Sequence, residues 1–287
     1  MIVVCGEALI DMISSADGTQ HAMAGGGPFN TARALAHLGV PAAFLGRLSG
    51  DRFGRELASL LVADGVSLEM ASIGPEPTTI ALADVNADGF AEYRFVIEGT
   101  SAPNLTLDML PERLAQDVTA LHIGTLGLTL EPIASTLVEL VRRERDGRLV
   151  MLDPNIRAGL AGEGEYRERV LSLIAQSTIV KASEGDLDWV VTLGAEGAYG
   201  THRDLRVQVT APAVDVVDTF GAGDAFGAAL LAWLHDHGAV RPELSLDGDQ
   251  LQAALDYACL AASITCRRGG ADPPWKRELS GEAQSGT

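Results

Sequence analysis

The sequence has few cysteines, little positive charge and no long apolar run. The three cysteines, Cys5, Cys259 and Cys266, are widely spaced without a metal-binding pattern, so we interpret them as buried thiols of a cytoplasmic protein. Lys and Arg number 21 against 39 Asp and Glu, and the net charge of −18 argues against a nucleic-acid partner. No apolar run approaches the roughly 18 residues that span a bilayer. The apolar opening MIVVCGEALIDMI lacks the basic region of a signal peptide, so we expect no membrane partner.

Short apolar runs alternate with helical patterns along most of the chain. The segment 51–65 places Phe53, Leu57, Leu60 and Leu61 on one helical face and ends at Gly65. The strand-like runs are residues 1–5 (with a continuation to Ile10 left open), 42–46, 120–124, 148–152, 178–181 and 189–193. This alternation predicts an α/β fold with a mostly parallel sheet covered by helices on both faces. Ligands of such sheets bind beyond the carboxyl ends of the strands.

Two segments depart from this alternation. Residues 12–24 and about 77–100 have no helical period, and Asp88-Gly89 is a hairpin turn signal. They predict either a small β-sheet that forms a lid over the site or an antiparallel edge of the main sheet. No interdomain linker is evident, so we expect a single domain over 1–287, with a disordered tail at 280–287.

A Gly-rich turn precedes a helical pattern in DTFGAGDAF (218–226). Gly221, Ala222 and Gly223 place backbone N–H groups at a helix start, where they can hold developing negative charge. Asp224 beside such an anion hole can take a proton from an attacking hydroxyl. The alternative is a common structural role, in which Asp224 is the N-cap of the helix.

A second Gly-rich turn leads into a helical pattern at residues 24–39. Gly26 and Gly27 allow the backbone to approach a ligand closely, and Asn30 offers both a donor and an acceptor to a sugar hydroxyl. Pro28 suits the first helical turn. The common nucleotide fingerprints are absent, and a tight loop before a core helix remains the alternative.

Polar residues follow several of the expected strands at the same edge of the sheet. They are Asp11, the segment DPNIR (153–157), the segment KASE (181–184) and the segment TLGAEG (192–197). A carboxylate such as Asp11 can bind a polyol, and Glu184 can reach a metal directly or through water. Each segment alone is also consistent with an ordinary solvated strand end.

Together these motifs resemble the PfkB, or ribokinase-like, family of carbohydrate kinases. GGGPFN (25–30) and DTFGAGDAF are similar to the two signatures of that family, and the resemblance covers nearly the whole chain. GEALIDMI, EGTSA (98–102), DPNIR and VKASE look most like bacterial fructokinases and 2-keto-3-deoxygluconate kinases. The resemblance implies a three-layer α/β/α sandwich with a small β-sheet lid.

The resemblance also implies transfer of the ATP γ-phosphate to a sugar hydroxymethyl group. Asp224 matches the catalytic base and Gly221, Ala222 and Gly223 the anion hole, with Gly221 and Gly223 also contacting ATP. The matching sugar-binding positions are Asp11, Gly26, Gly27 and Asn30, with Arg157 as an addition. The matching ATP positions are Lys181, Thr192, Gly194 and Gly197. Mg²⁺ is expected with ATP near Glu184, through water; K⁺ as a monovalent cation and a homodimer through the lid are further expectations.

The chain departs from the family pattern at two places. Lys181 replaces the amide of the family's N-x-x-E motif, whereas the acid is retained as Glu184. In addition, EGDLDW runs directly into VVTLGAEG, where relatives carry a further helical stretch between Trp189 and Val190. Either the chain has a real deletion there or a segment is absent from this sequence. A real deletion bears on stability and ATP binding more than on the chemistry of Asp224.

Two other functions compete with an active sugar kinase. A nucleoside kinase would use an aromatic pocket for the base, and the lid segment offers Phe90, Tyr93 and Phe95. A non-catalytic sugar-binding relative would not need an acid beside an anion hole. A nicotinamide-dependent oxidoreductase is set aside because the dinucleotide fingerprint is absent. The sequence does not choose the sugar.

Overall fold

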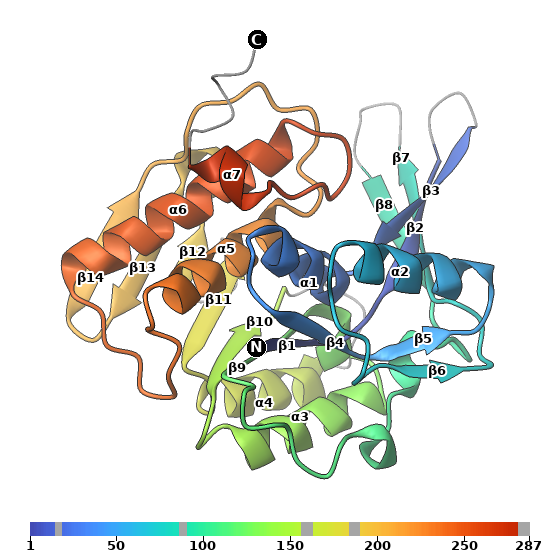
Figure 1. The fold of residues 1–287 in the computed structure, drawn as a ribbon. Helices are drawn as coiled ribbons and strands as arrows, with labels where there is room; N and C mark the ends of the chain where they lie inside the picture. The colour runs from blue at the N-terminus through green and yellow to red at the C-terminus, as the bar shows by residue number, and fades with distance from the viewer. Residues whose placement is uncertain (15–18, 86–90, 156–162, 184–189, 281–287) are drawn as a thin grey trace.

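The main sheet has eight strands in the order β14-β13-β12-β11-β10-β9-β1-β4 (Figure 1). The computed structural model describes residues 1–14, 19–85, 91–155, 163–183 and 190–280. The parallel strands are β1 (Ile2–Cys5), β4 (Ala42–Leu45), β9 (Ala120–Gly124), β10 (Leu149–Asp153), β11 (Ile179–Ser183) and β12 (Val190–Thr192). At one edge the sheet gains the antiparallel strands β13 (Ala198–His202) and β14 (Leu205–Val209). The apolar runs in the sequence thus became the parallel strands, and the added hairpin was not anticipated.

Helices cover both faces of the main sheet. One face packs against α1 (Gly27–His37), α5 (Ala222–Asp236) and α6 (Gly248–Cys266), and the other against α3 (Ile133–Glu144) and α4 (Glu163–Ile174) (Figure 1). Alternate residues of β1 serve the two faces, because Ile2 and Val4 join the first core and Val3 and Cys5 the second. The expected α/β/α sandwich is confirmed.

The helix expected over 51–65 is α2 (Arg52–Ala63). The Asp51 side chain caps it by accepting a hydrogen bond from the Gly54 N–H at 2.8 Å. The remaining helical elements are short: α7 (Lys276–Leu279) and the 3-10 turns η1 (Ala102–Asn104), η2 (Leu107–Met109), η3 (Thr125–Leu128) and η4 (Gly194–Glu196).

A smaller four-stranded sheet stands apart from the main one. It consists of β2 (Leu9–Ser14), β3 (Gln20–Gly25), β7 (Ile80–Val85) and β8 (Ala91–Val96), in the order β3-β2-β7-β8. Two hairpins, β2-β3 and β7-β8, are joined through parallel pairing of β2 with β7. Of the two interpretations of these segments, the separate small sheet is correct. A two-stranded sheet, β5 (Arg47–Ser49) with β6 (Ser72–Gly74), completes the strands.

Two sequence expectations need correction. The first strand does not continue to Ile10: the chain turns at Gly6, whose φ of +147° is one that L side chains rarely adopt, and enters the small sheet. The expectation of three buried thiols is wrong for Cys266, which is partly exposed, whereas Cys5 and Cys259 are buried.

The connection between β11 and β12 is unusually short. The two strands are parallel neighbours, with Lys181 opposite Val190 and Ser183 opposite Thr192, and only residues 184–189 join them. Such crossovers normally take a dozen or more residues, usually including a helix. A stretch that the family resemblance leads us to expect is missing between Trp189 and Val190. The structure shows that this point lies between two parallel strands, β11 and β12, and that the six residues joining them are too few for the usual crossover helix.

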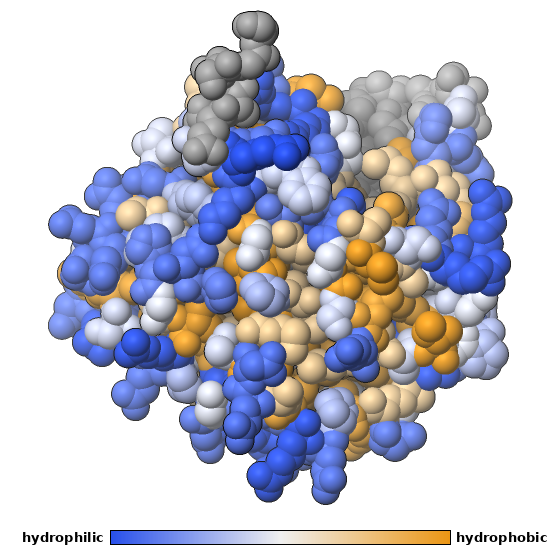
Figure 2. All heavy atoms as spheres, viewed as in Figure 1, coloured by the Kyte–Doolittle hydropathy of each residue, from blue (hydrophilic) through white to orange (hydrophobic). Residues whose placement is uncertain are grey.

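Hydrophilic residues cover much of the face drawn in Figure 2, in keeping with the large negative charge. Figure 2 shows apolar residues gathered near the middle of one face, in the region of α1, α2 and the start of β1, within a hydrophilic surround. None of the helices that the structure describes has the length and apolar character needed to cross a membrane.

Candidate active site

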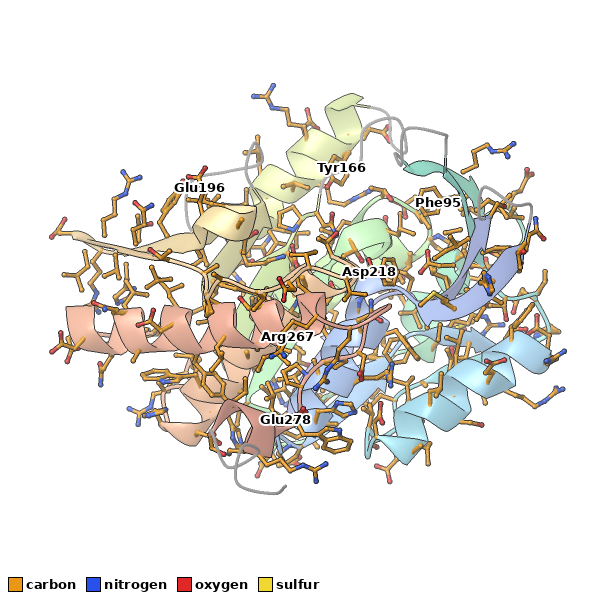
Figure 3. All side chains as sticks on the ribbon, turned by 90° about the horizontal axis from the view of Figure 1, so that it is seen from above. Phe95, Tyr166, Glu196, Asp218, Arg267 and Glu278 are labelled. Carbon is orange, nitrogen blue, oxygen red and sulfur yellow. The ribbon has the colours of Figure 1, made fainter. Side chains whose placement is uncertain are left out.

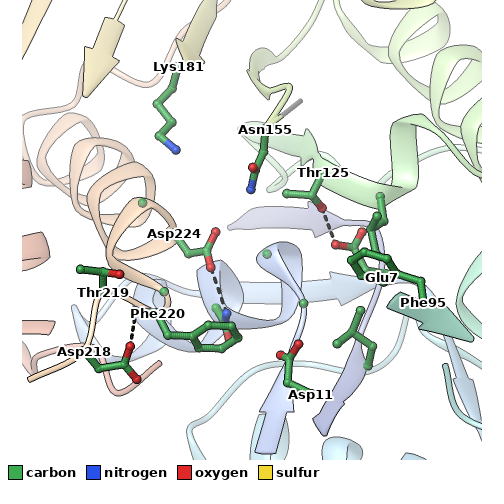
Figure 4. Close-up of a pocket in the computed structure, with 17 residues that line it drawn as sticks. Glu7, Asp11, Phe95, Thr125, Asn155, Lys181, Asp218, Thr219, Phe220 and Asp224 are labelled. Carbon is green, nitrogen blue, oxygen red and sulfur yellow. Dashed lines mark hydrogen bonds between the residues drawn. The ribbon is translucent and has the colours of Figure 1, made fainter. Parts of the chain in front are cut away.

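A cavity of about 340 Å³ lies where the carboxyl ends of the parallel strands meet the small sheet (Figure 4). Both sheets and the starts of α1 and α5 contribute to its wall. Eight residues expected from the sequence to act in the site line it: Asp11, Gly26, Gly27, Asn30, Lys181, Gly221, Gly223 and Asp224. Motifs that are distant in sequence therefore converge on one cavity.

Asp224 lies in the first turn of α5 and faces this cavity. The N-cap of α5 is Gly221, at φ +74°, and no side chain caps the helix there. A Cβ atom at Gly221 would lie 2.5 Å from the Cβ of Ala271, so a glycine is needed. Asp224 instead accepts a hydrogen bond from Asn30 Nδ2 to its Oδ2 at 2.9 Å. The N-cap interpretation of Asp224 is therefore wrong.

The surroundings of Asp224 raise the pKa of its carboxyl group toward neutral pH. Desolvation by the surrounding protein raises the pKa of Asp224 from 3.8 to about 7. The hydrogen bond from Asn30 and the positive charge of Lys181 oppose this rise, while the acids Asp153 and Glu7 add to it. A carboxylate with this pKa is suited to general-base work near pH 7.

The start of α5 offers backbone donors beside Asp224. The first N–H groups of a helix have no intrahelical acceptor and bind anions well. Of the three residues expected to form the anion hole, Ala222 differs from Gly221 and Gly223. Its N–H donates a hydrogen bond to the carbonyl of Thr219 at 3.3 Å, and it does not line the cavity. Gly223 lines the cavity, as expected.

Lys181 lies in β11 and is held in a buried ion pair. Its Nζ donates to Oδ2 of Asp153 at 2.8 Å, and the two side chains are 3% and 2% exposed. A Cβ atom at Gly223 would lie 3.1 Å from Lys181 Nζ, so the ammonium group faces the first turn of α5. The sequence departure at Lys181 thus places a positive charge, already paired with an acid, beside the expected anion hole.

The other wall of the cavity comes from β2, β3 and the start of α1. Asp11 lies within β2 of the small sheet, and not beyond the first strand of the main sheet as expected. A Cβ atom at Gly25 would collide with Asp11 Oδ2, and one at Gly26 would lie 2.8 Å from the carbonyl of Glu7. These glycines let the chain pass close to Asp11 and Glu7.

Several expected site residues lie elsewhere. Thr192 ends β12, Gly194 and Gly197 belong to the turn between β12 and β13, and none of the three lines the cavity. Arg157 and Glu184 lie outside the described residues. In Figure 3 Asp218, which precedes α5, lies between Glu196 of this turn and Phe95 of the small sheet. The turn and the small sheet thus flank the start of α5 on opposite sides.

The cavity also contains residues to which the sequence analysis gave no role. Glu7, Thr125 and Phe220 line it, and Asp218 organises the loop before α5. Asp218 accepts the N–H of Phe220 at 3.0 Å and that of Gly270 at 2.8 Å. Asp218 and Phe220 lie within the DTFGAGDAF motif, so the motif could have indicated them as site residues. Glu7 and Thr125 are brought together only by the fold.

Comparison with known proteins decides the family. A family model for pfkB family carbohydrate kinases matches residues 1–190 and 189–277. The chain belongs to this family. The two matched segments meet at the junction between β11 and β12, where relatives were expected to carry an additional stretch.

The curated relatives include fructokinases. A fructokinase from Rhizobium leguminosarum bv. trifolii is 39% identical over 261 residues, covering 82% of this chain and 79% of the relative. Fructokinase-1 from Oryza sativa subsp. japonica is 32% identical over 312 residues, covering 97% and 95%. That second alignment is longer than the 287 residues of this chain, so part of the relative has no counterpart here.

Solved structures with the same fold include several kinases. An uncharacterized sugar kinase from Pyrococcus horikoshii is 25% identical with a TM-score of 0.87, covering 98% of this chain and 96% of the other. A fructokinase from Vibrio cholerae O395, in fructose, ADP and calcium ion bound form, is 25% identical with a TM-score of 0.85, covering 98% and 97%. An aminoimidazole riboside kinase from Salmonella enterica is also 25% identical, with a TM-score of 0.84 and 98% of each chain covered. The expectation of an ATP-dependent carbohydrate kinase with a ribokinase-like fold is therefore confirmed.

Proposed function

We propose that this kinase transfers the γ-phosphoryl group of ATP to a hydroxymethyl group of fructose or a closely similar ketose. The proposal rests mainly on the position of Asp224. Its carboxyl group has a pKa of about 7, lies at the start of a helix and faces a small polar cavity. The fructokinase relatives support fructose as the first sugar to test.

In this proposal Asp224 is the general base. Its Oδ2 is held by Asn30, so Oδ1 is the oxygen that takes the proton from the attacking hydroxyl. The hydroxyl oxygen then bonds to the γ-phosphorus and ADP leaves. The N–H groups at Gly223 and Asp224, together with the ammonium of Lys181, stabilise the charge on the transferred group.

Sugar and nucleotide occupy opposite sides of the α5 start. Asp11, Gly26, Gly27 and Asn30 bind the sugar, with Arg157 as a further contact, and the small sheet acts as the lid. The turn that carries Gly194 and Gly197 binds ATP together with Thr192, the last residue of β12. It lies on the side of α5 away from the small sheet (Figure 3), and residues 210–211 pack closely against Gly197.

Mg²⁺ is the divalent ion expected with ATP. Among the residues that the structure describes, no cluster of three or more His, Cys, Asp or Glu forms a protein metal site. Mg²⁺ is commonly held by one or two carboxylates, by water and by substrate phosphates. Glu184 would hold the ion through water, and the bound ion would neutralise charge on the β- and γ-phosphates. K⁺ dependence is proposed as well and is tested by replacing K⁺ with Na⁺ in the assay.

A nucleoside is the less supported acceptor. Phe95 of the small sheet lines the cavity, as a nucleoside kinase would require, and the Salmonella enterica neighbour is a riboside kinase. The cavity of about 340 Å³, however, is near the lower limit for small-molecule sites. A non-catalytic role is disfavoured, since sugar binding alone needs no base beside an anion hole.

An ADP-release assay with Mg·ATP tests the proposal. The acceptors are fructose, other ketoses, sugar acids, ribose and nucleosides, and phosphorus NMR locates the phosphate on the product. Turnover confined to fructose or a similar ketose supports the proposal. Preference for a nucleoside, or a phosphate on a secondary hydroxyl, contradicts it.

We further propose a homodimer formed through the small sheet. Val96, at the end of β8, is 49% exposed although apolar, and β8 is an edge strand. Light scattering that gives a clean monomer mass at assay concentration would remove this proposal.

A further inference from the structure

Thr125 has a backbone conformation that is rare for its residue type. Its φ is +56°, in the left-handed region, where β-branched side chains are genuine outliers. It follows β9 directly, at the start of η3, and its side chain lines the cavity. Strained residues of this kind persist only where the surrounding structure holds them, and they concentrate at functional sites.

Glu7 holds this turn in place. Thr125 Oγ1 donates a hydrogen bond to Glu7 Oε1 (Figure 4). The Gly127 N–H donates to Glu7 Oε2 at 3.0 Å. Glu7 is only 2% exposed, and it follows β1, the neighbour of β9 in the main sheet. Both carboxylate oxygens therefore accept hydrogen bonds from η3, one from the side chain of its first residue and one from the backbone two residues later.

The side chain of Thr125 faces the reacting part of the proposed site. A Cβ atom at Gly27 would lie 2.5 Å from Thr125 Cγ2 and 3.2 Å from Asp224 Oδ1. The methyl group of Thr125 and the open oxygen of Asp224 thus lie against the same glycine. Asn30 holds the other oxygen of Asp224 from α1. A shift of the η3 turn would change the space beside the oxygen that takes the proton.

We propose that Glu7 is a positioning residue: it fixes Thr125 in its strained turn, so that Thr125 and Gly27 together set where the sugar hydroxyl meets Asp224. The inference rests on the proposed role of Asp224 as base. It extends that role to a carboxylate that does not itself contact the reacting atoms.

The test compares Thr125→Val, which keeps the shape and removes the hydroxyl, with Thr125→Ser, which keeps the hydroxyl. Thr136 in α3 offers a matched control, because it is also a buried threonine whose Oγ1 donates a hydrogen bond of 3.0 Å, to the carbonyl of Leu105. Thr136 does not line the cavity. We measure kcat, the KM for sugar and for ATP, and the unfolding temperature of Thr125→Val, Thr125→Ser and Thr136→Val.

Thr125→Val is expected to lower kcat by roughly 10- to 100-fold with little change in the KM for ATP, because misplacement by about 1 Å can cost that much. Thr125→Ser should recover most of this loss. Thr136→Val should lower the unfolding temperature and leave kcat unchanged. If Thr125→Val loses stability to the same degree as Thr136→Val and keeps normal kcat, the hydrogen bond is purely structural and the inference is wrong.

Glu7→Gln provides a second, independent readout should Thr125→Val fold poorly. The negative charge of Glu7 helps to raise the pKa of Asp224, so its removal should shift the acid limb of the kcat/KM profile to lower pH while kcat falls. An unchanged kcat and profile would overturn the inference. A wild-type protein that phosphorylates no sugar would instead overturn the proposed function, so the two failures are distinguishable.

Discussion

Replacing Asp224 with Asn tests the proposed chemistry most directly. The amide has the shape of the carboxyl group, and its oxygen can still accept the hydrogen bond that Asn30 Nδ2 makes at 2.9 Å. The substitution therefore keeps the contact between α1 and α5 and removes only the ability to take a proton. We expect Asp224→Asn to fold and to bind sugar.

The expected loss of activity is large. General-base catalysis contributes about 10²- to 10⁴-fold, so kcat should fall by that factor, which corresponds to roughly 3–5 kcal/mol in activation free energy. Wild-type kcat/KM should rise with pH up to about 7, as Asp224 loses its proton, and the residual activity of Asp224→Asn should lack that step.

The pH dependence of stability provides a second test of the raised pKa of Asp224. The folded-state pKa of Asp224 is about 7, above the unfolded value of 3.8, so the native state binds the extra proton between these values. The stability contributed by this proton is present below about pH 4 and is lost as the pH rises through 7. Asp224→Asn lacks this loss, so its unfolding temperature at pH 8 should exceed that of the wild type.

The assay pairs ADP release with isothermal calorimetry of sugar binding and thermal unfolding from pH 4 to 8. Near-normal turnover in Asp224→Asn would refute the base assignment. Normal sugar binding with a kcat reduced less than about tenfold would also refute it, because a positioned base contributes more than that.

Three further substitutions probe the walls of the cavity. Gly27→Ala places a Cβ atom 2.5 Å from Thr125 Cγ2, and this steric clash should lower kcat by roughly 10²-fold. Steady-state kinetics equal to those of the wild type would show that the clash does not matter for catalysis. Lys181→Met leaves Asp153 buried without its cation and should cost about 3–5 kcal/mol in urea unfolding, with recovery when Asp153→Asn is added; a double variant no more stable than the single one would argue against the pair. We place Phe220 against the sugar because it lines the cavity, so Phe220→Ala should raise the KM for sugar roughly tenfold through lost apolar contact; an unchanged KM would contradict that contact.

The sequence predicted the parallel strands well because their signal is local. Strands such as β1 and β9 are buried on both faces and appear as continuous apolar runs. The hairpin of β13 and β14 escaped notice, since LRVQV mixes charged and apolar residues at an exposed edge. A continuation of the first strand to Ile10 stayed open because apolar residues resume at Ala8, whereas the backbone changes direction at Gly6.

The candidate site was predictable where a motif carried it. Asp224, Gly223 and Asn30 belong to Gly-rich turns with a recognisable pattern, and the cavity contains all three. The pairing of Glu7 with Thr125 joins residues from opposite sides of a long stretch of chain, so no local pattern encodes it. The ion pair of Lys181 with Asp153 likewise depends on the adjacency of β11 and β10, which strand order decides.

The topology of the small sheet has a consequence for synthesis of the chain. β2 carries Asp11, and its register with β7 pairs Ile10 with Ile80 and Ser14 with Asp84. All of α1, β4 and α2 lie between these partners in the sequence. A nascent chain can form the β2-β3 hairpin early, but β2 gains its second neighbour only after residue 85 has left the ribosome. Closing so long a loop is entropically costly and slow, so the strand that carries Asp11 stays an open edge while α1 and α2 are already available to fold.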